Sequence, residues 1–201
     1  MHFMKKYILS LILIFSFFNL FSDQLLEKVK TKYLEIKTLE SNLSQTNNFT
    51  LQDISLVSNG KLFINNTNLV IEYTKPHYQF IKATDEFLTI YSKNENTAFI
   101  TESNNQVITT LLHFHSLVSQ DSKFIKKIDN LHHYQILKPI EPLKELHIFI
   151  DATTELITRI SYIDDMDNVV TLDFSEQKLN SRLSKTIESF IIPSNVNIIY
   201  Q

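Results

Sequence analysis

Histidine and acidic side chains are the residues of this sequence that could do chemistry, but their spacing assembles neither a catalytic nor a metal site. His113 and His115 are two residues apart, and side chains at that spacing on a helix point away from each other. His132 and His133 are neighbours, which places them on opposite faces of a strand. Because a metal site needs further ligands and groups that orient them, the sequence predicts no metal.

The acidic run Asp164, Asp165, Asp167 resembles a calcium-binding loop only superficially. It lacks the central Gly and the closing Glu of such a loop. A hairpin turn rich in Asp and Asn accounts for these residues. Asp85-Glu86 also falls at a predicted turn, where carboxylates are usually solvated.

Glycine and cysteine are nearly missing from the sequence, which removes several reaction classes. Gly60 is the one glycine, and there is no cysteine. A phosphate-binding loop or a G-x-S-x-G nucleophile turn needs more than one glycine. Disulfides, and acylation of an N-terminal cysteine, need a thiol. The sequence therefore predicts that the protein is not an enzyme and uses no cofactor.

The elements that must position any binding site are mostly strands. Between Gly60 and Thr101, five short runs of β-branched and aromatic residues are separated by polar turns. Such runs predict antiparallel strands joined by hairpins. Residues 39–47 could form an earlier strand, with 48–58 as a polar connection or partly extended segment. Later runs with the same character are HHYQILK, LHIFID, LITRISYI, NVVTLDF and the closing segment FIIPSNVNIIY.

Two segments have helical rather than strand periodicity. Residues 23–38 place Leu25, Val29 and Tyr33 on one face, with charged residues elsewhere. Residues 106–118 form an unusually apolar helical insertion, and the pattern of 121–129 extends it by a second helical turn. Both helices need an apolar surface to cover.

Several strands are apolar on one face and only partly polar on the other. Residues 68–73 and 78–84 show this pattern, whereas a sheet with one solvated face alternates more cleanly. Two interpretations fit. The strands form one layer of a two-layer core, or the concave face of the sheet packs helices and holds an apolar ligand.

The N-terminus has the layout of a secretory signal peptide. Lys5-Lys6 precedes an apolar run over 8–21, and the small residue Ser22 follows. The run is short for a membrane span, which needs ~20 residues, although an uncleaved anchor is the alternative. We expect cleavage near Ser22 and a single domain over 23–201, located in the periplasm. With 19 basic and 22 acidic residues, the charge balance does not favour nucleic acid as a partner.

Five short segments occur in a characteristic order: Leu43-Ser44-Gln45, Gly60-Lys61-Leu62, LVIEYTKP at 69–76, LKP at 137–139 and FIIPSNVNI at 190–198. This ordered set resembles the periplasmic outer-membrane lipoprotein carrier proteins, the LolA family. The chain departs from the family at Asn65-Asn66-Thr67, where members often carry an Arg-Pro pair thought to control lid opening.

The resemblance implies an α+β, mostly β fold, an incomplete antiparallel β-barrel with helices covering its concave hydrophobic face. It implies a monomeric carrier that shields the acyl chains of lipoprotein cargo, with an inner-membrane ATP-driven transporter and an outer-membrane acceptor as partners. A regulatory binding protein of the same fold is the alternative. The residues we expect to contact lipid are Leu43, Leu62, Ile64, Leu69, Ile71, Tyr73, Phe80, Leu88, Ile90 and Phe99 from the sheet, with Leu112, Phe114 and Leu117 from the lid.

Overall fold

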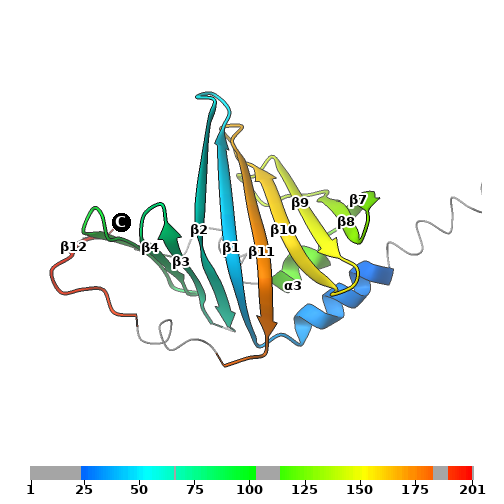
Figure 1. Cartoon of the computed structure of the whole chain (residues 1–201), viewed down its shortest axis with the longest axis horizontal. Helices are drawn as coiled ribbons and strands as arrows, with labels where there is room; N and C mark the ends of the chain where they lie inside the picture. The colour runs from blue at the N-terminus through cyan, green and yellow to red at the C-terminus, as the bar shows by residue number, and fades with distance from the viewer. Residues whose placement is uncertain (1–23, 66, 103–113, 183–189, 201) are drawn as a thin grey trace, which may run out of the picture.

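The computed structural model describes residues 24–65, 67–102, 114–182 and 190–200, and its main element is a single twelve-stranded sheet (Figure 1). The strand order is β12-β6-β5-β4-β3-β2-β1-β11-β10-β9-β8-β7. All neighbours pair antiparallel except β12, which runs parallel to β6. The strands are β1 (Thr38–Phe49), β2 (Ile54–Asn65), β3 (Leu69–Lys75), β4 (Gln79–Ala83), β5 (Phe87–Ser92), β6 (Thr97–Glu102), β7 (Ser122–Ile128), β8 (Leu131–Ile136), β9 (Glu145–Asp151), β10 (Leu156–Ile163), β11 (Val169–Leu179) and β12 (Asn197–Tyr200).

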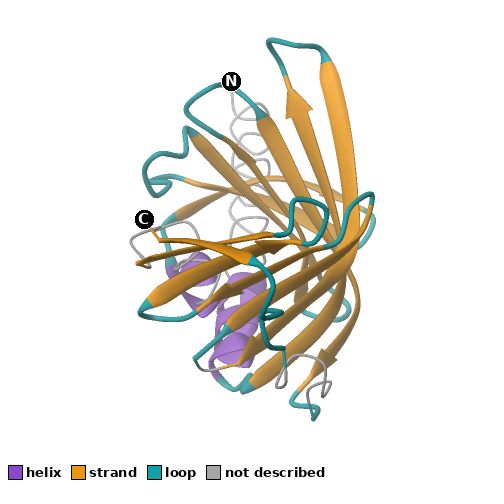
Figure 2. Cartoon of the chain, turned by 90° about the vertical axis from the view of Figure 1, so that its left-hand side faces the viewer, coloured by secondary structure: helices purple, strands orange, loops and turns teal. Residues whose placement is uncertain are grey.

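The sheet is strongly curved and stays open. Strands β12 and β7 form its two edges, and no pairing joins them. Figure 2 shows the strands wrapping around an inner side without closing the barrel. The prediction of a mostly β fold built on an unclosed, curved antiparallel sheet is therefore confirmed.

The predicted meander is present, but its first hairpin is longer than expected. Strand β2 begins at Ile54 rather than near Gly60, and β1 pairs with it from Thr38 to Phe49 without a break. The segment 48–58 is thus mostly extended, with a short turn between the strands. Asp53 has a φ of 52° there, a left-handed conformation that Asp tolerates better than most residues.

The prediction of a helical turn over 121–129 was wrong, because this segment forms the edge strand β7. Its apolar residues also suit a strand, and pairing with β8 decides between the two. Phe124 lies edge-on to Tyr134 of β8, with ring centroids 5.6 Å apart. The two strands are joined at Asp129-Asn130, a dipeptide suited to a tight hairpin turn, and Asp129 has a φ of 51°.

The inner face of the sheet carries the main hydrophobic core. Strand β9 shows the alternation most clearly, since Leu146, Ile148 and Ile150 are buried while the residues between them are partly exposed. Equivalent positions on β10, β11 and β1 join the same cluster. The outer face of these strands carries polar groups such as the ion pair between Arg159 Nε and Asp173 Oδ1, at 2.6 Å.

Two helical segments contribute to this core, a helix over residues 24–34 and α3 (Phe114–Ser119). Val29 is fully buried, and Leu117 and Val118 of α3 are 1% and 2% exposed. Figure 2 shows both helices on the inner side of the curve. The insertion predicted over 106–118 is described only from residue 114 on, so a helical cover over the rest of this face stays a prediction.

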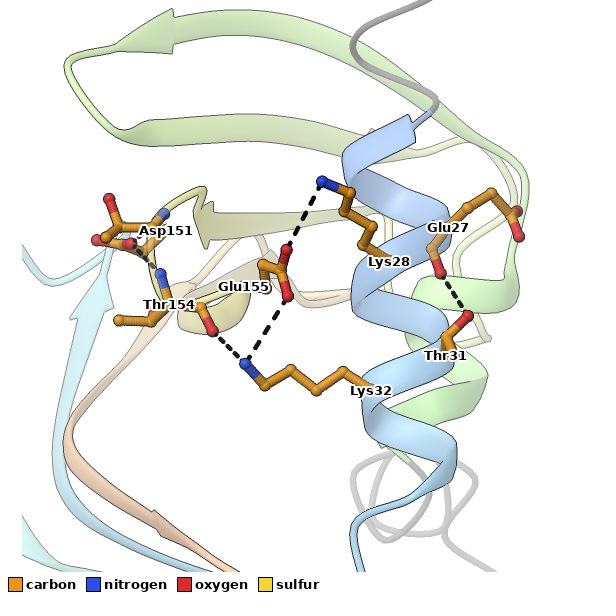
Figure 3. A network of polar contacts seen from close by, with 8 residues as sticks. Glu27, Lys28, Thr31, Lys32, Asp151, Thr154 and Glu155 are labelled. Carbon is orange, nitrogen blue, oxygen red and sulfur yellow. Dashed lines mark hydrogen bonds and ion pairs between the residues drawn. The ribbon is translucent and has the colours of Figure 1, made fainter.

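Polar contacts fix the N-terminal helix to the turn between β9 and β10 (Figure 3). Lys32 Nζ donates to the carbonyl oxygen of Thr154 at 2.6 Å, and Glu155 forms longer ion pairs with Lys28 and Lys32 at 4.0 and 3.9 Å. Asp151 Oδ1 accepts a hydrogen bond from the backbone N–H of Thr154 and thereby orders the turn. Exposed pairs of this kind contribute little each, so the buried side of the helix supplies most of its attachment.

Replacing Tyr33 by Phe is expected to destabilise the protein by about 1–3 kcal/mol, because it leaves a buried N–H without a partner. The Tyr33 hydroxyl accepts a hydrogen bond from the backbone N–H of Ile157 at 2.9 Å, and Tyr33 is 5% exposed. Burial raises the pKa of this hydroxyl, although the Ile157 hydrogen bond acts in the opposite direction. Urea unfolding measures the change, with Tyr200→Phe at an exposed position as the control. Equal effects of the two substitutions would contradict this role.

A second, smaller core lies on the outer face of β2 to β6. Its buried residues are Phe63, Val70, Phe80, Tyr91 and Ala98, and it is covered by Phe190, Ile192 and Val196 of the C-terminal segment. The chain then continues into β12 on the far edge of β6. The predicted closing extended segment therefore covers the outer face before it pairs, a placement the sequence did not indicate.

The predicted signal peptide, residues 1–22, lies outside the described residues. Within the described part of the chain, no helix has the length and apolar character needed to cross a membrane.

Candidate lipid-binding face

The structure brings most of the predicted lipid-contacting residues together on the inner face. The members of the main core cluster, either buried in it or packed against it, are Leu43, Leu62, Ile64, Leu69, Ile71, Tyr73, Leu88, Ile90 and Leu117. Phe99 stands opposite Ile90 in the β5–β6 ladder and so shares its face. Leu112 lies outside the described residues. Phe114 begins α3, but its side chain is not among those described.

Phe80 is placed apart from the other predicted residues, on the outer face. It is 1% exposed and belongs to the second core cluster. Its ring stacks on Phe190 with centroids 3.6 Å apart. The predicted role of Phe80 as a lipid contact therefore does not fit its position, because the C-terminal segment already covers its ring.

An apolar row crosses five strands of the inner face. In the ladders from β2 to β6, each member stands directly opposite the next, in the order Leu62, Ile71, Ile81, Ile90 and Phe99. Side chains opposite each other in a sheet touch on one face, so the row is continuous. Leu62 is buried, whereas the other four are only partly buried. This apolar row is the part of the inner face that still offers hydrophobic surface.

Ile81 is the member of the apolar row that sequence reasoning missed. Residues 78–84 are apolar on both faces, so alternation alone could not decide whether Phe80 or Ile81 points inward. The register decides, because Ile81 pairs with both Ile71 and Ile90. The signal that could have identified Ile81 was its place between Ile71 and Ile90, two predicted lipid contacts on the neighbouring strands.

Uncharged hydrogen-bonding side chains lie next to the apolar row, and we call Gln45, Asn47, Tyr73 and Tyr162 the neutral polar cluster. The Tyr73 hydroxyl donates to Gln45 Oε1, and Gln45 Nε2 donates to Asn47 Oδ1 at 2.9 Å. Burial, followed by the neighbouring Tyr162, raises the pKa of the Tyr73 hydroxyl, and burial with nearby Asp164 raises that of Tyr162. Both phenols therefore stay neutral at physiological pH.

Gly60 lies next to Tyr73, where β2 and β3 approach closely. In the ladders, Gly60 of β2 stands between Leu43 of β1 and Tyr73 of β3. A Cβ at this position would press against the backbone of Glu72 and Tyr73. The single glycine of the chain thus sits where two strands approach closely, a position typical of glycine in sheets.

The inner face of β1 to β6 carries almost no charge. At the inward positions of β1, β2, β4, β5 and β6, every described side chain is apolar or uncharged polar. On β3, Lys75 lies at the strand end and is exposed. The face is therefore suited to an apolar ligand with uncharged polar groups.

His133 and His147 form a polar contact on the outer face of the sheet. His133 Nε2 lies 3.0 Å from His147 Nδ1, a pairing the sequence did not reveal, and its ring stacks on Phe149. Burial, and then the neighbouring His147 and Lys126, lowers the pKa of His133. In the described part of the chain, no group of three or more His, Cys, Asp or Glu residues is arranged to hold a metal.

The acidic turn is a structural cap, as the sequence indicated. Asp164 Oδ1 accepts hydrogen bonds from the backbone N–H groups of Met166 and Asn168 at 2.9 and 2.8 Å. Partial burial alone would raise the pKa of Asp164, but these hydrogen bonds and the nearby Lys144 hold it below its usual range. These contacts account for the carboxylate without a bound cation.

The curved open sheet with its partly exposed apolar inner face places the protein in the class of β half-barrels. The chain belongs to the LolA family, because the family model "Outer membrane lipoprotein carrier protein LolA" matches residues 35–190. Proteins of this superfamily are carrier or binding proteins rather than enzymes. The family predicted from the ordered sequence segments is thereby confirmed.

A solved structure supports the fold at low sequence identity. An uncharacterized conserved protein from Thermus thermophilus is similar with a TM-score of 0.57 at 12% identity, covering 90% of this chain and 99% of that one. Two further matches have lower TM-scores. A LolA superfamily protein from Nitrosomonas europaea matches with 0.44 at 10% identity, covering 82% and 96%. The MucA/MucB complex of Pseudomonas aeruginosa matches with 0.49 at 7%, covering 88% and 62%. No curated protein sequence matches the chain.

Proposed function

We propose that the protein is a periplasmic carrier that shields the acyl chains of lipoproteins between the inner and outer membranes. The observation that carries this proposal is the apolar row on the inner face of a LolA-family sheet. Its members Ile71, Ile81 and Ile90 are only partly buried by the rest of the described protein. A plain structural core would bury them fully.

The energetics of acyl chains explain why a carrier needs such a face. Each acyl CH₂ group removed from water contributes ~0.8 kcal/mol, so a lipoprotein with several chains does not leave a membrane unaided. The apolar row offers one continuous strip along which chains can lie. Loading and release both require that this binding be favourable but reversible.

A helical lid over the concave face is part of the proposal. The buried residues Leu117 and Val118 of α3 attach that helix to the inner-face core. We propose that Leu112, Phe114 and the segment around them close over the empty face and open for lipid, a population shift between two states. The Arg expected near 65–67 in the family is absent from the sequence, so a different contact must control opening.

The proposed partners follow from the direction of transport. An inner-membrane ATP-driven transporter would load the carrier, and an outer-membrane acceptor with higher affinity for acyl chains would unload it. The predicted signal peptide, cleaved near Ser22, would place the mature chain in the periplasm as a monomer.

Mass spectrometry of protein purified from the native periplasm tests the proposal. We expect an acylated lipoprotein to co-purify, and we expect the purified protein to release lipoproteins from spheroplasts. A stoichiometric protein partner without lipid would instead support a regulatory binding protein of the same fold. Absence of any acylated molecule, together with no release from spheroplasts, would refute the carrier role.

A further inference from the structure

The neutral polar cluster lies where the polar end of a bound lipid would be. Tyr73 is two residues from Ile71 on the same strand and face, a separation of roughly 7 Å. An acyl chain lying along the apolar row would therefore bring the group attached to its end close to the Tyr73 hydroxyl. Gln45 and Asn47 continue the cluster along β1, because Gln45 is hydrogen-bonded to Tyr73 on one side and to Asn47 on the other.

The chemistry of the cluster favours uncharged hydrogen-bonding groups. Its primary amides have N–H groups that can donate to carbonyl oxygens, and its hydroxyl and amide oxygens can accept from amide N–H groups. A phosphate at the cluster would lose water without gaining a cation, and a desolvated, unpaired charge is strongly unfavourable.

The charged groups around the cluster do not reverse this preference. Asp164 faces Tyr162 closely enough to raise its pKa, and a carboxylate repels a second anion. Lys75 lies beyond Tyr73 at the strand end, where it is exposed and solvated. Lys144 is paired with Asp167 at 2.6 Å.

We propose that the neutral polar cluster holds the ester and amide groups that join acyl chains to their carrier molecule, so that the protein selects uncharged acyl-glycerol linkages over phosphate-bearing lipids. This inference rests on the proposed function and names the feature of the cargo that the inner face recognises. The uncharged character of the cluster then determines specificity, whereas the apolar row supplies affinity.

Competitive lipid uptake tests the inference. The protein is incubated with phosphatidylcholine vesicles that contain equal amounts of dipalmitoylglycerol and dipalmitoyl-phosphatidylglycerol, and the lipid bound to the re-isolated protein is quantified by mass spectrometry. We expect dipalmitoylglycerol to be enriched about tenfold, because its competitor would place a desolvated phosphate at the cluster without a cation to pair with. Gln45→Lys, which places a cation in the cluster for a phosphate to pair with, should remove most of this enrichment without lowering the total acyl chain bound.

A matched control and a second variant keep the outcome clear. Tyr78→Phe is the control, because the Tyr78 hydroxyl bonds to Glu72 at 3.1 Å, away from the neutral polar cluster, and its enrichment should equal that of the wild type. Asn47→Lys should behave like Gln45→Lys and covers the case in which that variant does not fold. Uptake at the vesicle ratio, or preference for phosphatidylglycerol, would overturn the inference while leaving the carrier function intact. Failure to take up any lipid would overturn both.

Discussion

Placing aspartate at Ile71 is expected to abolish the binding of acyl chains and the release of lipoproteins from spheroplasts. Ile71 is a central member of the apolar row, opposite Leu62 on one side and Ile81 on the other. A carboxylate brought against acyl chains costs several kcal/mol, and on the order of 3 kcal/mol corresponds to roughly a hundredfold loss of affinity. The measurement is lipoprotein release, together with lipid uptake from vesicles.

The Ile71→Asp variant should stay folded, because Ile71 is only partly buried. Circular dichroism and thermal unfolding check this. Val57→Asp is the matched control, since Val57 lies on the outer face of β2 and is 49% exposed. Unimpaired release by Ile71→Asp, or an equal loss with Val57→Asp, would remove the apolar row as the lipid-binding surface.

Replacing Gly60 by alanine is expected to destabilise the fold by about 3 kcal/mol, a large effect for one methyl group. A Cβ at this position would press against the carbonyl oxygen of Glu72 and lie 2.8 Å from the Cα of Tyr73. Both are backbone atoms, so β2 and β3 would have to move apart at the irregularity between Asn59 and Gly60. Urea unfolding measures the loss.

Ser58→Ala is the control for this prediction. Ser58 precedes Gly60 by two residues on the same face of β2 and is partly exposed, so its change should stay within about 0.5 kcal/mol. If Gly60→Ala were as stable as the control, the close approach of β2 and β3 would not be a constraint. A variant that folds but is less stable should also weaken the contact between Tyr73 and Gln45.

Most of the strands could be predicted because their signals are local. The runs between residues 60 and 101 and between residues 131 and 174 are rich in β-branched and aromatic residues and lie between polar turns, and each forms a strand next to a sequence neighbour. The family could be predicted for the same reason, since the ordered segments carry it without any knowledge of long-range contacts. The helix over 24–34 has an apolar stripe with a period of 3.6 residues. Val29 and Tyr33 of this stripe are buried in the core.

The errors arose where a segment had two acceptable local structures. Residues 122–128 place apolar side chains at spacings that suit a helix as well as a strand, and pairing with β8 selected the strand. Phe80 was assigned to the lipid face because residues 78–84 are apolar on both sides. Phe80 lies on the outer face instead, where its ring stacks on that of Phe190. The two residues are more than a hundred positions apart in the sequence.

The sequence by itself determined the family, the mostly β composition, and the hairpins, because these depend on side-chain periodicity and turn chemistry within a few residues. Only the tertiary structure decided that β1 pairs with β11, that β12 runs parallel to β6, and which face of β4 looks inward. It also brought Gln45 and Tyr73 together over Gly60. These features depend on strand register between distant segments. A strand that is apolar on both faces carries no local information about register, and packing in the folded sheet supplies it.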